Sequence, residues 1–200
     1  QEVCVGKKVI QKKDRMVLLA VNKPTGIVCT EEKREKKNII RFLNYPTRIT
    51  YIGRLDKDSE GLLLMTNDGD LINAMMRARY GHEKEYKVTV DRPLGEDFKE
   101  KMEQGVHITD KEKNLDAVTR PCKVEVLGKY TFTIVLTQGL NRQIRRMCEA
   151  LGYKVKRLVR VRIMNITLGS LKAGEVRKLS KQELKELYCL LYTSPSPRDA

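Results

Sequence analysis

The hydrophobic positions of this chain predict a protein built largely of strands. Leu62 to Met65 is an uninterrupted apolar run between polar turns, which is typical of a buried strand. Tyr86, Val88 and Val90 alternate with polar residues, as in a strand with one buried face. Further strands are predicted for residues 17–21, 27–29, 49–52, 123–127 and 130–137, with tight connections across the Asn22–Gly26 turn and around Gly128.

Helical spacing predicts the remaining elements. Asn38 is a suitable N-cap for a short helix that Pro46 ends, and Ser180 can cap a last helix to about Tyr188. Residues 109–114 show no period and are predicted to form a polar loop. Amphipathic helices are predicted for residues 70–77, 98–104 and 141–151, which together with the strands indicates an α+β fold with a mixed, mainly antiparallel sheet.

The loop before the apolar run concentrates the charged residues that could do chemistry. Between two glycines it carries Asp56, Asp58 and Glu60 with the bases Arg54 and Lys57. A carboxylate held on a loop at a strand end can act on a ligand that lies across the sheet. The alternative is a solvated charged turn, the usual setting of a charge cluster.

Composition favours a polyanionic partner. The chain has 200 residues, with 40 Lys plus Arg against 26 Asp plus Glu, a formal charge of +14 and a pI near 9.6. Eight bases and one acid lie between Asn141 and Arg162, as expected of a phosphate-binding surface. The chain has no long apolar segment or signal-peptide core, which argues against membrane insertion and secretion.

The cysteines and the chain ends set further limits. Cys4, Cys29, Cys122, Cys148 and Cys189 are widely spaced without a C-x-x-C pair, so we expect reduced core thiols and no metal site. Residues 1–15 are basic and lack a core pattern, residues 16–189 form the expected domain, and residues 190–200 are predicted to be a disordered or foreign tail.

Three segments strongly resemble the motifs of the RsuA-like branch of pseudouridine synthases, which isomerise uridine within RNA. They are GRLDKDSEGLLLMTNDG from Gly53, EKEYKV from Glu83 and GLNRQIRRM from Gly139, and the Asn22–Gly26 turn is similar to the N-K-P-x-G segment of the same family. The resemblance covers residues 17–188 in family order. Its details are most similar to members that act on large-subunit ribosomal RNA.

The resemblance implies roles for individual residues. Asp56 would be the catalytic carboxylate, Tyr86 would stack on the uracil, and Arg145 would pair with Asp56 to keep it ionised and oriented. Residues 1–15 would be the end of a removed S4-like RNA-binding domain. The candidate RNA contacts are Lys23, Arg54, Asn141, Arg142, Gln143, Arg146, Arg160 and Arg162.

The same resemblance implies two α+β subdomains around an RNA-binding cleft, with Asp56 on its floor. We expect a cytoplasmic monomer that needs no metal or organic cofactor. The alternatives are the same reaction on small-subunit ribosomal RNA or transfer RNA, a noncatalytic RNA-binding protein, and a glycoside hydrolase that uses two of the three loop carboxylates.

Overall fold

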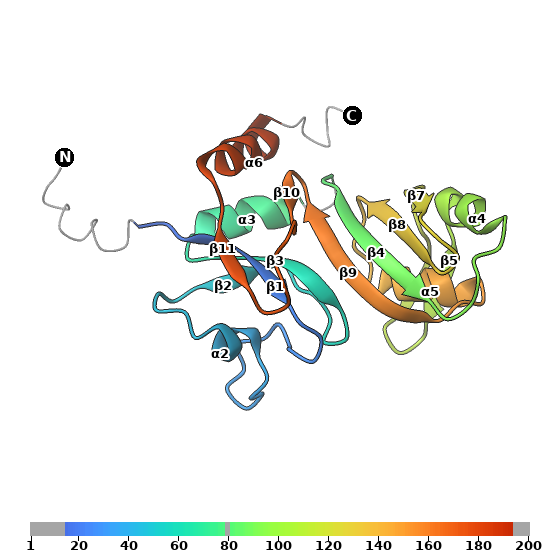
Figure 1. Ribbon diagram of the computed structural model, residues 1–200, viewed down its shortest axis with the longest axis horizontal. Helices are drawn as coiled ribbons and strands as arrows, with labels where there is room; N and C mark the ends of the chain where they lie inside the picture. The colour runs from blue at the N-terminus through green and yellow to red at the C-terminus, as the bar shows by residue number, and fades with distance from the viewer. Residues whose placement is uncertain (1–14, 79–80, 194–200) are drawn as a thin grey trace, which may run out of the picture.

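The computed structural model describes residues 15–78 and 81–193 and shows an α+β protein with one large sheet (Figure 1). Nine of the described strands form this sheet in the order β11-β1-β3-β9-β4-β8-β7, with β2 on β3 and β10 on β9. All pairings are antiparallel except that of β3 with β9. The predicted fold class is confirmed.

The elements follow the expected order along the chain. The strands of the large sheet are β1 (Leu18–Lys23), β2 (Thr50–Ile52), β3 (Glu60–Thr66), β4 (Lys84–Val90), β7 (Lys123–Val126), β8 (Thr131–Leu136), β9 (Val155–Ile163), β10 (Ile166–Thr167) and β11 (Val176–Lys178). The helices are α2 (Ile39–Leu43), α3 (Gly69–Arg77), α4 (Phe98–Gln104), α5 (Gln143–Ala150) and α6 (Lys181–Thr193). A separate two-stranded sheet pairs β5 (His107–Asp110) with β6 (Leu115–Val118).

One half of the sheet is buried on both faces, which explains its uninterrupted apolar strands. Leu62 and Leu64 of β3 pack with Leu71 of α3 and Leu187 of α6. Leu63 and Met65 face the other way, toward a core that also includes residues of α2. Every residue of β1 is therefore buried, as expected for a strand between two layers of helix.

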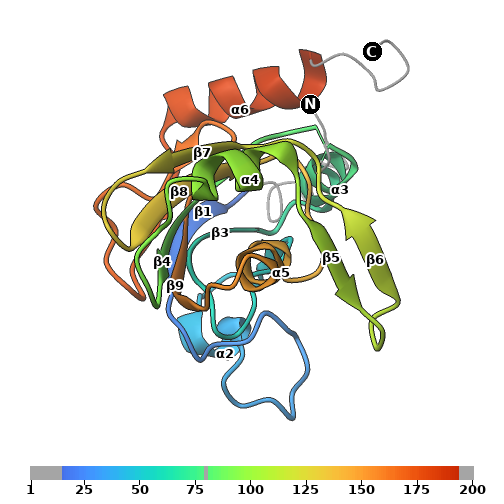
Figure 2. The same ribbon diagram turned by 90° about the vertical axis from the view of Figure 1, so that its right-hand side faces the viewer.

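The other half is covered on one face only, so its strands alternate. Val88 of β4 and Phe132 of β8 pack against Phe98 of α4 and Met147 of α5. Their polar neighbours lie on the opposite face. Figure 2 shows α4 and α5 in this half, with the β5–β6 hairpin projecting beside α5.

The nine-residue strand β9 joins the two halves. It pairs with β4 along the length of both strands, but with β3 only at Glu60↔Val159 and Gly61↔Arg160. Gly61 has a φ of +112°, and a Cβ there would lie 2.3 Å from the carbonyl oxygen of Arg160. The close approach of β3 to β9 therefore requires glycine at this position.

Two local predictions were wrong. Residues 27–29 do not form a strand beside β1, which pairs with β3 and β11 instead, and the segment makes one isolated bridge, Val28 with Asn38. The expected loop at 109–114 is the end and turn of the β5–β6 hairpin. Its strands carry polar side chains on an exposed face, so their alternation of apolar and polar residues is weak.

The last helix is longer than expected. Ser180 caps it through a hydrogen bond from the Glu183 amide, as predicted, but it continues past Tyr188 to Thr193. Residues 190–193 are thus helical and not part of a tail. The predictions for residues 1–14 and 194–200 lie outside the described residues.

The thiol prediction was partly wrong. Cys29 and Cys148 are buried, Cys122 is half-buried and Cys189 is exposed, while Cys4 lies outside the described residues. Burial raises the pKa of Cys122 to about 11 and that of Cys148 to about 12. These two thiols therefore stay protonated near neutral pH.

Substitution of Gly61 tests the junction. We expect Gly61→Ala to lower the free energy of unfolding by about 3 kcal/mol, because the methyl group would be forced against the Arg160 backbone at a positive φ. Urea unfolding of both proteins measures the difference. Gly69→Ala is the matched control: it has open space in the first turn of α3 and should leave stability unchanged or raise it slightly.

Candidate active site

A cavity of about 300 Å³ lies between the two halves and brings together the three residues predicted to be catalytic. Asp56 comes from the loop between β2 and β3, Tyr86 from β4, and Arg145 from α5. The Asp56 side chain is 45% exposed, so a ligand can reach it. The cleft predicted between two subdomains is present, and Asp56 lines it.

The cavity has an extensive apolar wall beside its charged residues, which are Asp56 and the cations Arg54, Lys84, Arg142, Arg145 and Arg160. Tyr86 is partly buried and packs against the core beneath β4. A flat, uncharged ligand could therefore bury its faces here while its edge meets polar groups. The apolar lining residues are Ile52, Leu55, Leu64, Met75, Met76, Leu136, Leu140, Ile144, Leu158 and Ile163.

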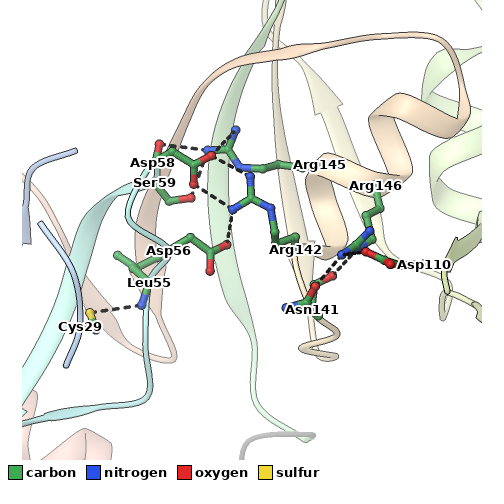
Figure 3. Close-up of polar contacts among 10 residues, drawn as sticks. All are labelled: Cys29, Leu55, Asp56, Asp58, Ser59, Asp110, Asn141, Arg142, Arg145 and Arg146. Carbon is green, nitrogen blue, oxygen red and sulfur yellow. Dashed lines mark hydrogen bonds and ion pairs between the residues drawn. The ribbon is translucent and has the colours of Figure 1, made fainter. Parts of the chain in front are cut away.

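The segment that follows β1 supports the Asp56 loop from below. The Gly26 amide donates to the Lys57 carbonyl at 2.7 Å, and the Leu55 amide donates to the Cys29 sulfur at 3.5 Å. The Ser59 amide closes the loop on the Asp56 carbonyl at 3.0 Å. Figure 3 shows the Leu55 contact with Cys29 and the Asp56 side chain directed away from it, toward Arg142.

Lys23 is a correction to the predicted RNA contacts. Its side chain is fully buried, and its ammonium group donates to the carbonyls of Pro24 and Ile27 at 2.8 and 2.7 Å. Burial lowers the pKa of Lys23, while nearby Cys29 and Asp56 act in the opposite direction. Lys23 therefore stabilises the turn beneath the loop, and a phosphate cannot reach it.

The arginine beside Asp56 is Arg142 and not Arg145, which is a second correction. Arg142 Nη1 lies 3.4 Å from Asp56 Oδ2. Arg145 Nη2 instead donates to the Asp58 carbonyl at 3.0 Å and to the Ser59 hydroxyl at 3.2 Å. Figure 3 shows the two guanidinium groups directed at different parts of the loop.

The local backbone explains this exchange of positions. Arg142 immediately precedes α5 and adopts a left-handed conformation with φ of 48°, which directs its side chain at the loop. Arg145 lies in the first turn of the helix and reaches the base of the loop. Because both arginines approach the same loop, the motif alone could not say which one meets Asp56.

Asp58 is the centre of the contact between loop and helix, whereas from the sequence it had a role only in the glycoside hydrolase alternative. Its carboxylate accepts two hydrogen bonds from Arg142, at 3.0 and 2.7 Å, and lies 3.6 Å from Arg145 Nη1. The hydrogen bonds from Arg142 hold the pKa of Asp58 below its ordinary value, and the pKa of Arg142 is raised in turn. We call Asp58, Arg142 and Arg145 the loop clasp.

The remaining candidate contacts divide into two groups. Arg54, Asn141, Gln143 and Arg160 line the cavity together with Arg142. Of these, Gln143 and Arg160 are buried, whereas Arg54 and Asn141 are exposed at the surface. Gln143 also accepts a hydrogen bond from the Leu140 amide at 3.1 Å, which gives it a structural role at the start of α5.

Arg146 and Arg162 do not line the cavity. Arg146 forms an ion pair with Asp110 of the β5–β6 hairpin at 2.7 Å. Arg162 pairs with Glu83 and Glu85 at 3.1 and 2.9 Å. The cationic segment 141–162 is thus partly neutralised by acids from elsewhere in the chain.

The geometry does not favour the glycosidase alternative. Besides the clasp on Asp58, Glu60 accepts two hydrogen bonds from Arg157, at 3.1 and 2.9 Å. Asp56 is left as the loop carboxylate without a side-chain hydrogen bond within the described ranges. A two-carboxylate hydrolysis needs a second available carboxyl group across a sugar bond.

Within residues 15–78 and 81–193, no group of three or more His, Cys, Asp or Glu side chains could hold a metal ion. In the same residues, no helix is long and apolar enough to span a membrane.

Comparison with known proteins gives one consistent family. Residues 17–150 match the family model described as RNA pseudouridylate synthase. The chain is 51% identical over 181 residues to the dual-specificity RNA pseudouridine synthase RluF of Escherichia coli K12, covering 90% of this chain and 60% of that protein. It thus spans about 60% of the length of this curated relative.

More distant relatives cover a larger share of their own length. The chain is 34% identical to ribosomal large subunit pseudouridine synthase B of Bacillus subtilis, over 90% of this chain and 74% of that protein. A solved structure titled as that of a pseudouridylate synthase aligns with a TM-score of 0.77 and 32% identity, covering 86% of this chain and 74% of that one.

The loop clasp should make stability depend on pH. We expect Asp58→Asn to lower the free energy of unfolding by about 1 kcal/mol at neutral pH, because half-exposed ion pairs contribute little. The folded-state pKa of Asp58 lies below its ordinary value of 3.8. The advantage of the wild-type protein should therefore be complete above pH 3.8 and decline as the pH falls through the lower folded-state pKa. Urea unfolding from pH 7 to pH 2.5 measures the difference, and a gap that does not change with pH would contradict the clasp.

The two clasp arginines should differ in their effect on stability. Arg145 is the more buried and binds a backbone carbonyl, so Arg145→Gln should lower the unfolding free energy by about 2 kcal/mol. Arg142→Gln removes a more exposed pair and should lower it by about 1 kcal/mol or less. Arg34→Gln, which removes an exposed pair with Glu32, is the control and should have no measurable effect. Equal losses for the two clasp variants would be inconsistent with their different burial.

Proposed function

Because the chain belongs to the RNA pseudouridylate synthase family, we propose that it isomerises a uridine of large-subunit ribosomal RNA to pseudouridine, with Asp56 as the reacting residue. The family predicted from the three motifs is thereby confirmed. The observation that carries the proposed activity is the cavity itself, where an accessible carboxylate, a tyrosine ring and an apolar wall meet.

The reaction suits these residues. The N1–C1′ bond of uridine breaks, the uracil turns, and a new bond joins C5 to C1′, with the proton lost from C5 and another gained at N1. Asp56 can serve by attack at C1′, by attack at C6 of the uracil, or as a base in elimination across C1′–C2′. The apolar wall and Tyr86 would hold the detached uracil, so that it turns without leaving the site.

Arg142 and Arg145 would position Asp56 together. Arg142 lies beside the carboxylate, while Arg145 fixes the backbone two residues further along the loop. A guanidinium next to a carboxylate favours its ionised form and sets its direction. Arg145 would thus act on Asp56 through the loop, whereas Arg142 would act on it directly.

The choice of ribosomal RNA rests on charge and on relatives. The target nucleotide must leave its stack, and contacts between cationic side chains and the RNA backbone would offset that free energy. The chain carries a formal charge of +14, and Arg54 and Arg142 line the cavity. The Bacillus subtilis relative is named for the large ribosomal subunit. A ribosomal RNA substrate would place the protein in the cytoplasm.

Replacement of Asp56 tests the proposed activity. Asp56→Asn should reduce pseudouridine formation about 1,000-fold or more, because the amide can neither attack carbon nor accept a proton. The assay is tritium release from RNA labelled at uracil C5, with modification mapping of ribosomal RNA from cells that lack the protein. Asp97→Asn, at the residue before α4 and outside the cavity, is the matched control and should retain activity. Turnover by Asp56→Asn at the wild-type rate would exclude Asp56 as the reacting residue.

A further inference from the structure

Arg160 of β9 lies in an unusual environment for an arginine. It is 4% exposed, and its Nε donates to the carbonyl of Leu62 at 2.8 Å. Its Nη2 is buried and has no hydrogen-bond partner in the described part of the chain, and no carboxylate there lies within ion-pair distance. A buried donor without a partner is rare, because it loses its hydrogen bonds to water on folding.

The side chain belongs to the same cavity as Asp56. Arg160 lines that cavity, and the antiparallel register places it directly opposite Tyr86 of β4. Residues opposite each other in neighbouring strands project from the same face of the sheet. The two side chains therefore leave the sheet on the same face, with the Arg160 guanidinium extending to the Leu62 carbonyl of β3 and Leu158 on the same face one step along β9.

The surroundings favour a neutral acceptor as the partner of Nη2. Arginine only donates hydrogen bonds, so the missing group must accept one. Leu158 and Ile163, on the same strand, are apolar and line the cavity. Arg160 is buried, whereas Arg54, Arg142 and Arg145 of the same cavity are exposed or half-buried, so a charged phosphate would meet those arginines at a lower desolvation cost. A carbonyl oxygen at the edge of a flat ring meets these conditions better than a phosphate does.

We propose that Arg160 selects uracil at the target position by donating a hydrogen bond from its guanidinium to a carbonyl oxygen of the ring. The assignment rests on the proposed function and narrows the expectation that Arg160 contacts RNA to a contact with the target base. In cytosine, the carbonyl at C4 is replaced by an amine, which donates and cannot accept. An arginine that faces this amine leaves two donors opposed, and the wrong base is disfavoured.

The rotation of the detached uracil during the proposed reaction gives a second reason for a hydrogen-bond donor at Arg160. When uracil rotates so that C5 takes the position of N1, its two carbonyl oxygens exchange sides. A single fixed donor then meets an acceptor both before and after the rotation. Cytosine would present its amine to Arg160 in one of the two orientations, whichever carbonyl binds first.

The test compares the dissociation constants of RNAs that differ only in the target base. RNA hairpins carry uridine, 2-thiouridine or cytidine at the mapped target position, and their dissociation constants are measured for the full chain in the Asp56→Asn background, which prevents turnover. We expect uridine to bind about 10- to 100-fold more tightly than at least one of the two analogues. In Arg160→Met this preference should disappear, and in Arg160→Lys it should be intermediate.

Arg162→Met is the matched control. Arg162 lies two residues along β9, is paired with Glu83 and Glu85, and does not line the cavity. Its loss should change the three dissociation constants by the same factor. Thermal unfolding checks that each variant is folded, and Arg160→Lys keeps the test valid if the methionine variant does not fold.

The outcomes separate this inference from the proposed function. If wild-type protein forms pseudouridine but the Arg160 variants discriminate between the bases as well as their parent, the assignment of Arg160 is wrong and the proposed activity stands. A parent protein without any preference for uridine overturns the assignment too. If wild-type protein modifies no ribosomal RNA, the proposed function itself fails.

Discussion

The close approach of β3 to β9 is the constraint on which the site depends. Only two residue pairs of these strands are in register, and a glycine with positive φ allows the contact. The Asp56 loop immediately precedes β3, while Arg160 of β9 is part of the contact and Tyr86 lies opposite it on β4. A small shift at this junction would therefore move the carboxylate relative to the wall that would hold the base, since the two halves have separate cores. Productive geometry tolerates errors of only about 1 Å.

Many charged side chains of this protein form ion pairs with residues that are distant in the sequence. The segment 141–162 has seven more bases than acids, yet Arg142, Arg146, Arg157 and Arg162 each lie beside a carboxylate from another element. These pairs connect α5 to the Asp56 loop and to the β5–β6 hairpin, and β9 to β3 and β4. Part of the cationic segment therefore forms ion pairs that hold elements of the fold together. The long-range attraction for a polyanion comes from the excess charge of the whole chain.

The sequence predicted the architecture well where the hydrophobic pattern of a strand reflects how many of its faces are buried. The apolar run of β3 and the alternation of β4 follow directly from burial on two faces and on one face. The β5–β6 hairpin was missed because its exposed face carries polar residues such as His107 and Thr109, so its hydrophobic pattern is weak. The candidate residues Asp56, Tyr86 and Arg145 do line one cavity. The position of Arg142 was not predicted, because it depends on a left-handed residue before α5, and the burial of Lys23 and Arg160 depends on contacts between distant strands.

The distribution of hydrogen bonds in the loop clasp bears on how Asp56 can react. Arg142 could satisfy either carboxylate, but it makes both of its short contacts with Asp58 and lies 3.4 Å from Asp56. A carboxylate fully engaged by a guanidinium has its lone pairs occupied and is a weaker base and nucleophile. Because Asp58 accepts both hydrogen bonds from Arg142, Asp56 is oriented only by the charge of Arg142, and its oxygens stay open to the cavity. In the proposed reaction, the second aspartate of the loop would thus keep the first one available.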